Sequence, residues 1–183
     1  MTVACAHGQM ESLFVPDPTN HRAYRNALGS FPTGVTVITA MGDHGPIGMT
    51  VNSFTSVSLD PPLVLWAPAK SSSKHAQFLR AGHFTVHVLG SGQDHLCIAF
   101  SRGGSGFDGL HWTRNGNGVP ILPGTLTRFE CLRTDAHEAG DHTIILGRVL
   151  RVASREGEPL CFSRGMLGRF SAGMQACTCK PGL

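Results

Sequence analysis

The stretch GMTVNSFTSVSLDPPLVLW, residues 48–66, decides how this chain folds. Polar and apolar residues alternate along its first half, so an extended strand places Thr50 and Asn52 together on one polar face. If the strand continues, Ser56 falls on the same face. Alternation of this kind predicts a strand of an antiparallel sheet, whose polar face either meets water or lines a ligand site.

Runs rich in β-branched residues flank this stretch on both sides. Turn residues at 43–45 predict a hairpin, and the turn EAGDH at 138–142 joins two long extended runs. The expected strands span residues 34–40, 47–53, 63–66, 83–89, 126–137, 143–152 and 160–163. They do not alternate regularly with helices, as a parallel sheet would require. We therefore predict a mainly β fold, an antiparallel barrel with flanking helices.

Three short helices are expected around this barrel. A cap at Thr19 or Asn20 begins the first, which carries one apolar stripe and is closed off at Pro32. The serines of residues 71–73 can cap a second helix, and residues 93–101 form a third. These helices are too short and too few to build a core of their own.

The composition fits one globular domain of ordinary size. The chain has 183 residues, of which 41% are hydrophobic and 15% charged, and it includes 23 glycines. A chain of this kind is too apolar to be disordered and long enough to bury a core. The formal net charge is only +3 and the 15 basic residues are scattered, which argues against a nucleic-acid partner.

The ends of the chain and its cysteines point to the cytoplasm. The first residues lack the basic start and apolar stretch of a signal peptide, and no run approaches the ~20 apolar residues of a membrane helix. The six cysteines show neither paired metal-ligand spacing nor a disulfide framework. We expect a flexible leader at residues 1–18, one domain at 19–170 and a flexible tail at 171–183.

Five segments of the chain form an ordered set. They are FPTGVTVITA at 31–40, GMTVNSFTSVSLDPPLVLW at 48–66, FDGLHW at 107–112, AGDHTIILGRV at 139–149 and GEPLCFSRGMLGRF at 157–170. Together they resemble the successive signature segments of the flavin reductase-like, FMN-binding split-barrel family. The resemblance implies a six-stranded Greek-key split barrel, a homodimer, and a flavin held where two subunits meet and reduced by NADH or NADPH.

The resemblance also implies which residues bind the flavin. Those expected along the isoalloxazine ring and ribityl chain are Thr33, Gly34, Thr50, Val51, Asn52, Ser53 and Ser56. Those expected at the flavin phosphate are Ser71, Ser72 and Lys74. A helix amino terminus there would offer free N–H groups and a positive dipole end to an anion. The structural alternative is a capping serine beside a solvated lysine.

The turn AGDH is expected to border the nicotinamide. His142 would position NAD(P)H and Asp141 would orient the turn or His142 itself, because direct hydride transfer between two rings depends on stacking geometry. Arg169 would reach the flavin or the nicotinamide nucleotide. The segment SRGMLGRF is longer than the family pattern, so the choice between Arg164 and Arg169 stays open.

Two other functions fit parts of the sequence. HEAGDH holds several metal-ligating residue types, but the position four after His137 is Asp141, in a turn, so the helical His pair of a zinc protease is missing and no metal is expected. A flavin carrier or sensor could use the same barrel. The His142 turn favours an NAD(P)H:flavin oxidoreductase, with FMN as the expected flavin, FAD as the alternative and a monooxygenase as the partner that receives reduced flavin.

Overall fold

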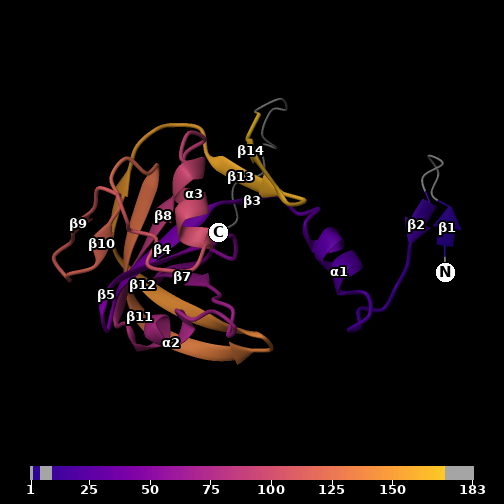
Figure 1. The fold of residues 1–183 in the computed structure, drawn as a ribbon, viewed down its shortest axis with the longest axis horizontal. Helices are drawn as coiled ribbons and strands as arrows, with labels where there is room; N and C mark the ends of the chain where they lie inside the picture. The colour runs from indigo at the N-terminus through magenta and orange to yellow at the C-terminus, as the bar shows by residue number, and fades with distance from the viewer. Residues whose placement is uncertain (1, 5–9, 172–183) are drawn as a thin grey trace.

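A seven-stranded antiparallel sheet forms the body of the molecule (Figure 1). The computed structural model describes residues 2–4 and 10–171. Its helices are α1 (His21–Leu28), α2 (His75–Arg80) and α3 (Asp94–Ser101). Its strands are β1 (Thr2–Ala4), β2 (Met10–Ser12), β3 (Thr33–Gly34), β4 (Thr36–Gly42), β5 (Gly45–Val51), β6 (Thr55–Leu59), β7 (Pro62–Trp66), β8 (His83–Val88), β9 (Thr113–Arg114), β10 (Pro120–Ile121), β11 (Thr127–Ala139), β12 (His142–Ser154), β13 (Leu160–Ser163) and β14 (Met166–Arg169). The prediction of a mainly β fold with flanking helices is confirmed.

The two edge strands of the sheet follow each other in the sequence. The strand order is β5-β4-β8-β11-β12-β7-β6, and only residues 52–54 separate β5 from β6. Such a link spans at most about 14 Å from one strand end to the next, so the sheet has to curl until its two edges come close. The result is a barrel that is split between β5 and β6. The sheet contains seven strands, so the expected count of six is not confirmed.

The strand that contains Thr50 was expected to continue to Ser56, but it ends before that residue. β5 ends at Val51, and a register shift between Ser56 and Ser58 interrupts the pairing of β6 with β7. Ser56 therefore lies on the opposite edge strand, where it pairs with Val64. Ser56 and Thr50 do not share a face of one strand, because the chain leaves one edge of the sheet after β5 and joins the other edge at β6.

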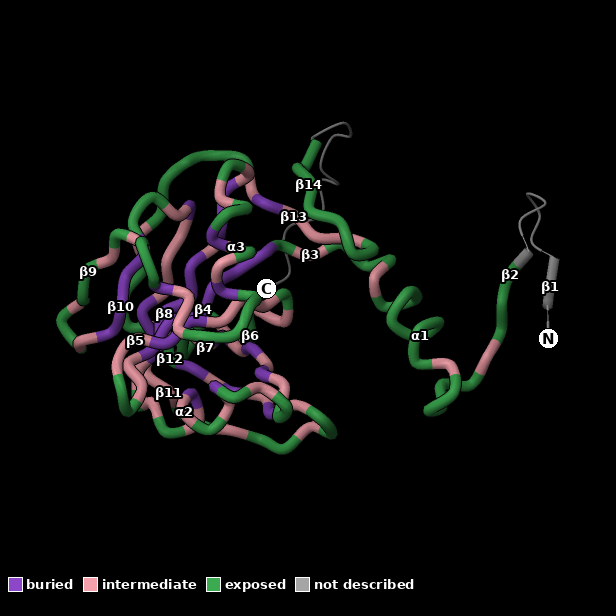
Figure 2. Tube along the Cα trace, viewed as in Figure 1, coloured by how far each residue is buried: buried purple, intermediate pink, exposed green. Residues whose placement is uncertain are grey.

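The sheet is buried on both faces at β4, where β-branched residues predominate. One face of β4 contributes Ile38 and Ala40 to a cluster inside the barrel that includes Trp66 and Phe84. The other face contributes Val37 to a second cluster that lies against α3 and a neighbouring loop, and its buried members are Val35, Val37, Leu89, Leu96, Phe100, Phe107, Leu122 and Leu160. Figure 2 shows this buried body in purple around the centre of the sheet.

Helix α1 stands apart from the barrel. It begins after Asn20, as expected, but none of its eight described residues is buried, and Figure 2 shows it exposed along its length. Its expected apolar stripe is therefore not buried within the described chain. β1 and β2 pair with each other inside the segment expected to be a loose leader. The division at residues 18 and 170 stays a prediction, and the tail from 172 onward lies outside the described residues.

The predicted serine cap of α2 is wrong. Lys74 occupies the N-cap position, and no side chain caps the helix. Residues 70–74 form turns that precede the helix, and within them the Ser72 hydroxyl oxygen accepts the backbone N–H of Lys74 at 3.3 Å. None of the described helices is both long and apolar enough to cross a bilayer.

Phe100 of α3 packs so closely on β5 that Gly48 can carry no side chain. A Cβ atom built on Gly48 would lie 2.4 Å from two ring carbons of Phe100. A Cβ on Gly106, in the loop after α3, would meet the same ring at 2.4 Å. These close approaches fix α3 and its following loop against β5.

We predict that Gly48→Ala lowers the free energy of unfolding by about 1–3 kcal/mol, because the added methyl overpacks the Phe100 ring. Urea unfolding followed by circular dichroism measures this change. Gly116→Ala is the matched control, since a Cβ at Gly116 has no atom within 4 Å. An equal effect of both substitutions would contradict the close packing of Phe100 on β5.

Candidate active site

The end of β5 opens into a pocket of about 360 Å³ beneath α3. Its lining residues are Val35, Thr50, Val51, Asn52, Cys97, Ser101, Phe162 and Leu167. The Thr50 hydroxyl donates to the Cys97 carbonyl oxygen at 2.7 Å, which anchors α3 over this wall. Three residues expected at the flavin ring therefore come together, and the pocket gains apolar side chains from Val35, just before β4, from β13 and from β14. Such a mixture of apolar walls and a few polar groups is typical of sites for planar heterocycles.

Thr33 and Gly34 lie directly before the Val35 wall of this pocket. Their strand, β3, pairs with β13, and the Val35 N–H donates to the Leu160 carbonyl oxygen at 3.1 Å. The Thr33 hydroxyl oxygen is buried and has no hydrogen-bond partner among the described residues. Gly34 is exposed, and a Cβ built there would meet no atom within 4 Å. An unpaired hydroxyl beside an open backbone fits the expected contact with a bound flavin.

Ser53 and Ser56 have different surroundings. The Ser53 hydroxyl oxygen accepts the Ala67 N–H at 3.0 Å, and the hydroxyl lies 3.2 Å from the Ala67 carbonyl oxygen. Ser53 therefore joins the link between β5 and β6 to the end of β7. Ser56 is exposed on β6 and is not among the residues that line the pocket. A direct flavin contact for either serine stays a prediction.

The turn between β11 and β12 brings Asp141 and His142 beside the end of β7. The Nδ1 atom of His142 lies 2.8 Å from the Asp141 carboxylate, and this hydrogen bond holds the pKa of the Asp141 carboxyl below its usual value. The Asp141 carbonyl oxygen accepts the Lys70 N–H at 2.9 Å, and His142 pairs with Ala69. The expected nicotinamide residues thus lie against the loop that leads to Ser71 and Ser72.

His87 illustrates a histidine with a structural role. Its Nε2 atom lies 3.1 Å from the Thr39 hydroxyl, which in turn donates to the Pro120 carbonyl oxygen at 2.6 Å. Complete burial lowers the pKa of His87 to about 3. This side chain stays neutral in the core, whereas His142 is 43% exposed and has an Nε2 atom without a hydrogen bond among the described residues.

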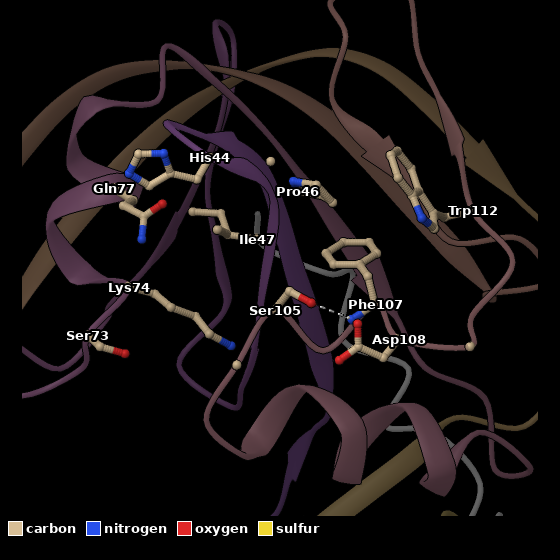
Figure 3. A pocket seen from close by; sticks show the side chains of 13 residues that line it. His44, Pro46, Ile47, Ser73, Lys74, Gln77, Ser105, Phe107, Asp108 and Trp112 are labelled. Carbon is tan, nitrogen blue, oxygen red and sulfur yellow. Dashed lines mark hydrogen bonds between the residues drawn. The ribbon is translucent and has the colours of Figure 1, made fainter.

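Lys74 lines a second and larger cavity, of about 690 Å³. Its Nζ atom donates to the Gly48 carbonyl oxygen at 2.6 Å, and burial of the side chain lowers its pKa. Figure 3 shows Lys74, Gln77 and His44 on one side of this cavity, with Phe107 and Trp112 on the other. Lys74 therefore lines a different hollow from Thr50 and Asn52, which line the smaller pocket.

Arg169 does not reach the pocket at the end of β5. It lies on β14, is exposed, and has its Nη1 atom 3.8 Å from the Glu158 carboxylate. It lines a neighbouring groove that shares only Leu167 with that pocket. The Arg164 backbone N–H donates to the Gly29 carbonyl oxygen at 2.9 Å, close to α1. A nucleotide contact for Arg169 stays a prediction, and the choice between it and Arg164 stays open.

The sequence did not indicate the apolar residues that line the pocket from β13 and β14, nor the aromatic residues that line the cavity. Phe162 and Leu167 reach the pocket from a hairpin more than a hundred residues away from Thr50. Phe107 and Trp112, which line the cavity, belong to the segment FDGLHW. That segment was a signal in the sequence, but no chemistry could be assigned to it until the cavity was seen.

A split barrel with a polar row opening into an apolar pocket is the architecture of a flavin-binding enzyme, and comparison with known proteins agrees. The family described as "Flavin reductase like domain" matches residues 28–171. The chain belongs to this family, and the expectation of a flavin reductase is confirmed.

Three relatives illustrate the match. The FMN reductase (NADH) SmoA of Agrobacterium fabrum is 64% identical over 161 residues, which cover 88% of this chain and 92% of that protein. The NADH-dependent FAD reductase of Streptomyces globisporus is 40% identical over 164 residues, which cover 85% and 88%. The crystal structure of nitrilotriacetate monooxygenase component B from Mycobacterium thermoresistibile has a TM-score of 0.83 and 34% identity, with coverage of 90% and 94%.

We predict that Asn52→Leu weakens flavin binding by about 1–3 kcal/mol, because an apolar branch leaves a polar edge of the ring without a partner. Titration of flavin fluorescence measures the affinity. Asn117→Leu, in an exposed turn remote from β5 in the sequence, is the control. Equal affinity of Asn52→Leu and the unaltered protein would remove Asn52 from the site.

Proposed function

We propose that this protein is an NADH-dependent reductase of FMN, with the flavin ring in the pocket at the end of β5. The observation that carries the proposal is the pocket itself, in which Thr50, Val51 and Asn52 meet the apolar side chains of Val35, Phe162 and Leu167. The unpaired Thr33 hydroxyl lies two residues before Val35 in the sequence. Polar groups on one rim and apolar walls around it suit a planar ring with a polar edge. FAD in place of FMN, and NADPH in place of NADH, are the alternatives.

The residues of the pocket bind and orient rather than react. A bound flavin supplies the acceptor for the hydride that NADH donates. Asn52 and Thr33 offer hydrogen bonds to the polar edge of the ring, and the apolar walls exclude water from its faces. What the protein contributes to the rate is the relative position of the two rings.

His142 positions the nicotinamide within this proposal. In the neutral form of the imidazole, the Asp141 carboxylate accepts the Nδ1–H and Nε2 is an acceptor on the exposed side of the ring. An acceptor there can hold the carboxamide N–H of a nicotinamide. Asp141 thus acts through His142, as its orienting partner.

A second copy of the chain is the proposed cover for the exposed apolar surface. Tyr24, Leu28 and Phe31 of the α1 region are 41%, 57% and 75% exposed. An isolated helix of eight residues is unstable in water, so its apolar stripe needs a partner. Met166 and Phe170 add exposed apolar surface beside the same end of the barrel. These features support a homodimer. Sedimentation equilibrium measures the mass of the assembly directly.

The proposed setting is a cytoplasmic two-component oxygenase. The likeness to a monooxygenase component supports a partner oxygenase that consumes reduced flavin. The free thiols of Cys97, Cys131 and Cys161 suit a reducing compartment. A flavin carrier is the competing function, and it predicts binding of flavin without oxidation of NADH.

We predict that the purified protein oxidises NADH when FMN is added, and that His142→Ala lowers the rate on the order of 10- to 100-fold through loss of ring alignment. Flavin affinity should change much less than the rate. Absorbance at the nicotinamide band and a flavin titration measure the two quantities.

His137→Ala is the matched control for this experiment. It removes another exposed imidazole paired with a carboxylate, that of Asp135 at 3.2 Å, from the same hairpin. A rate equal to that of the unaltered protein is expected. No oxidation of NADH above the spontaneous rate with any flavin would instead establish the carrier.

A further inference from the structure

The cavity of about 690 Å³ is not needed to hold a flavin ring. Its walls come from the β4–β5 turn, α2 and the loop after α3. They combine one ammonium group, that of Lys74, with polar side chains and with the rings of Phe107 and Trp112 (Figure 3). The volume is within the range of about 300–1,000 Å³ that is usual for small-molecule sites.

The cavity and the flavin pocket are neighbours along β5. Pro46 and Ile47 line the cavity, and Thr50 lines the pocket. At about 3.3 Å per residue, Ile47 and Thr50 are about 10 Å apart. Helix α3 and the loop after it supply residues to both hollows. Ser101 of α3 lines the pocket, and the loop that begins at Gly104 lines the cavity.

The Lys74 ammonium group lines the cavity and binds β5 at Gly48, which lies between Ile47 of the cavity and Thr50 of the pocket in the sequence. Its bond to the Gly48 carbonyl oxygen fixes it one residue from Ile47 and two residues from Thr50 along the strand. An ammonium group has three N–H donors, and this carbonyl is the acceptor found for it among the described residues. A buried cation of this kind is stabilised by an anion that takes up its remaining donors.

Three features thus follow one another along β5. The pocket for a ring comes at Thr50, the Lys74 cation at Gly48, and the cavity with an aromatic wall at Ile47. The Trp112 ring packs edge-to-face on Phe107, with centroids 5.4 Å apart, and the Arg114 guanidinium lies 5.8 Å from its centroid. Held in this way, the indole offers a fixed surface for stacking a base. Gln77 and Ser73 supply hydrogen-bonding groups on the Lys74 side of the cavity, and Asp108 adds a carboxylate to its lining.

We propose that this cavity binds the adenosine monophosphate group of a dinucleotide, with its phosphate on Lys74 and its adenine against Trp112. The inference rests on the proposed function, because it takes the neighbouring pocket as the place of the flavin ring. FAD carries such a group and FMN does not, so the cavity gives the enzyme a means of binding FAD in addition to FMN. NADH carries the same group, and the experiment below separates the two sources.

The test is a titration of the FMN-saturated protein with AMP. Trp66 is completely buried and Trp112 lines the cavity, so quenching of tryptophan fluorescence reports on Trp112. We expect saturable quenching, and calorimetry should give the same affinity. Trp112→Leu should weaken AMP binding about tenfold, which calorimetry detects without the fluorophore. Lys74→Gln should weaken binding of AMP but not of adenosine.

Arg151→Gln is the control for Lys74→Gln, because it removes the same charge from an exposed position on β12 outside the cavity. Equal loss of AMP affinity in both variants, or no AMP binding by the unaltered protein, would overturn the proposal. Trp112→Leu should also raise the KM for FAD relative to that for FMN; a rise in the KM for NADH instead assigns the adenylate group to the nicotinamide nucleotide. AMP titration needs no turnover, so a protein that oxidises NADH with FMN but ignores AMP refutes this inference alone.

Discussion

The link of three residues between β5 and β6 is the constraint on which the rest of the structure depends. It joins the two edges of a seven-stranded sheet, and Ser53 holds it to both backbone groups of Ala67. Because Ala67 directly follows β7 and the Pro68 carbonyl oxygen accepts the Thr143 N–H, the same link lies close to the turn that carries His142. The same contacts that close the barrel therefore also bring the residues of the site together.

Most of the barrel could be predicted because it depends on neighbours close in the sequence. Alternation along residues 49–52 and β-branched residues along 34–40 predict strands, and turn residues predict where each hairpin reverses. Gly140, with φ of +65°, provides the tight turn between the two long strands β11 and β12. Thr50 and Asn52, which parity places on one face, both line the pocket, but so does Val51 from the other face, and their contact with a flavin stays a prediction.

What could not be predicted depends on contacts between distant residues. Lys74 has the same local pattern whether its side chain is solvated or buried, and only the carbonyl of Gly48, twenty-six positions away, determines the outcome. Ser56 changes edge because the barrel closes, which no property of β6 alone requires. Helix α1 was correctly predicted, but the sequence does not say that none of its residues is buried within the described chain.

The split in the barrel also explains why binding sites form here. β5 is an edge strand, so one row of its backbone groups has no neighbouring strand. Helix α3 and the loop after it pack on the face of β5 next to this edge, where Phe100 closely approaches Gly48. A helix cannot fill the space beside a strand as evenly as another strand would, so hollows remain on either side of that contact. The pocket at Thr50 and the cavity at Lys74 are these two hollows, and a flat ring joined to a phosphate suits both their shape and the unpaired polar groups along the edge.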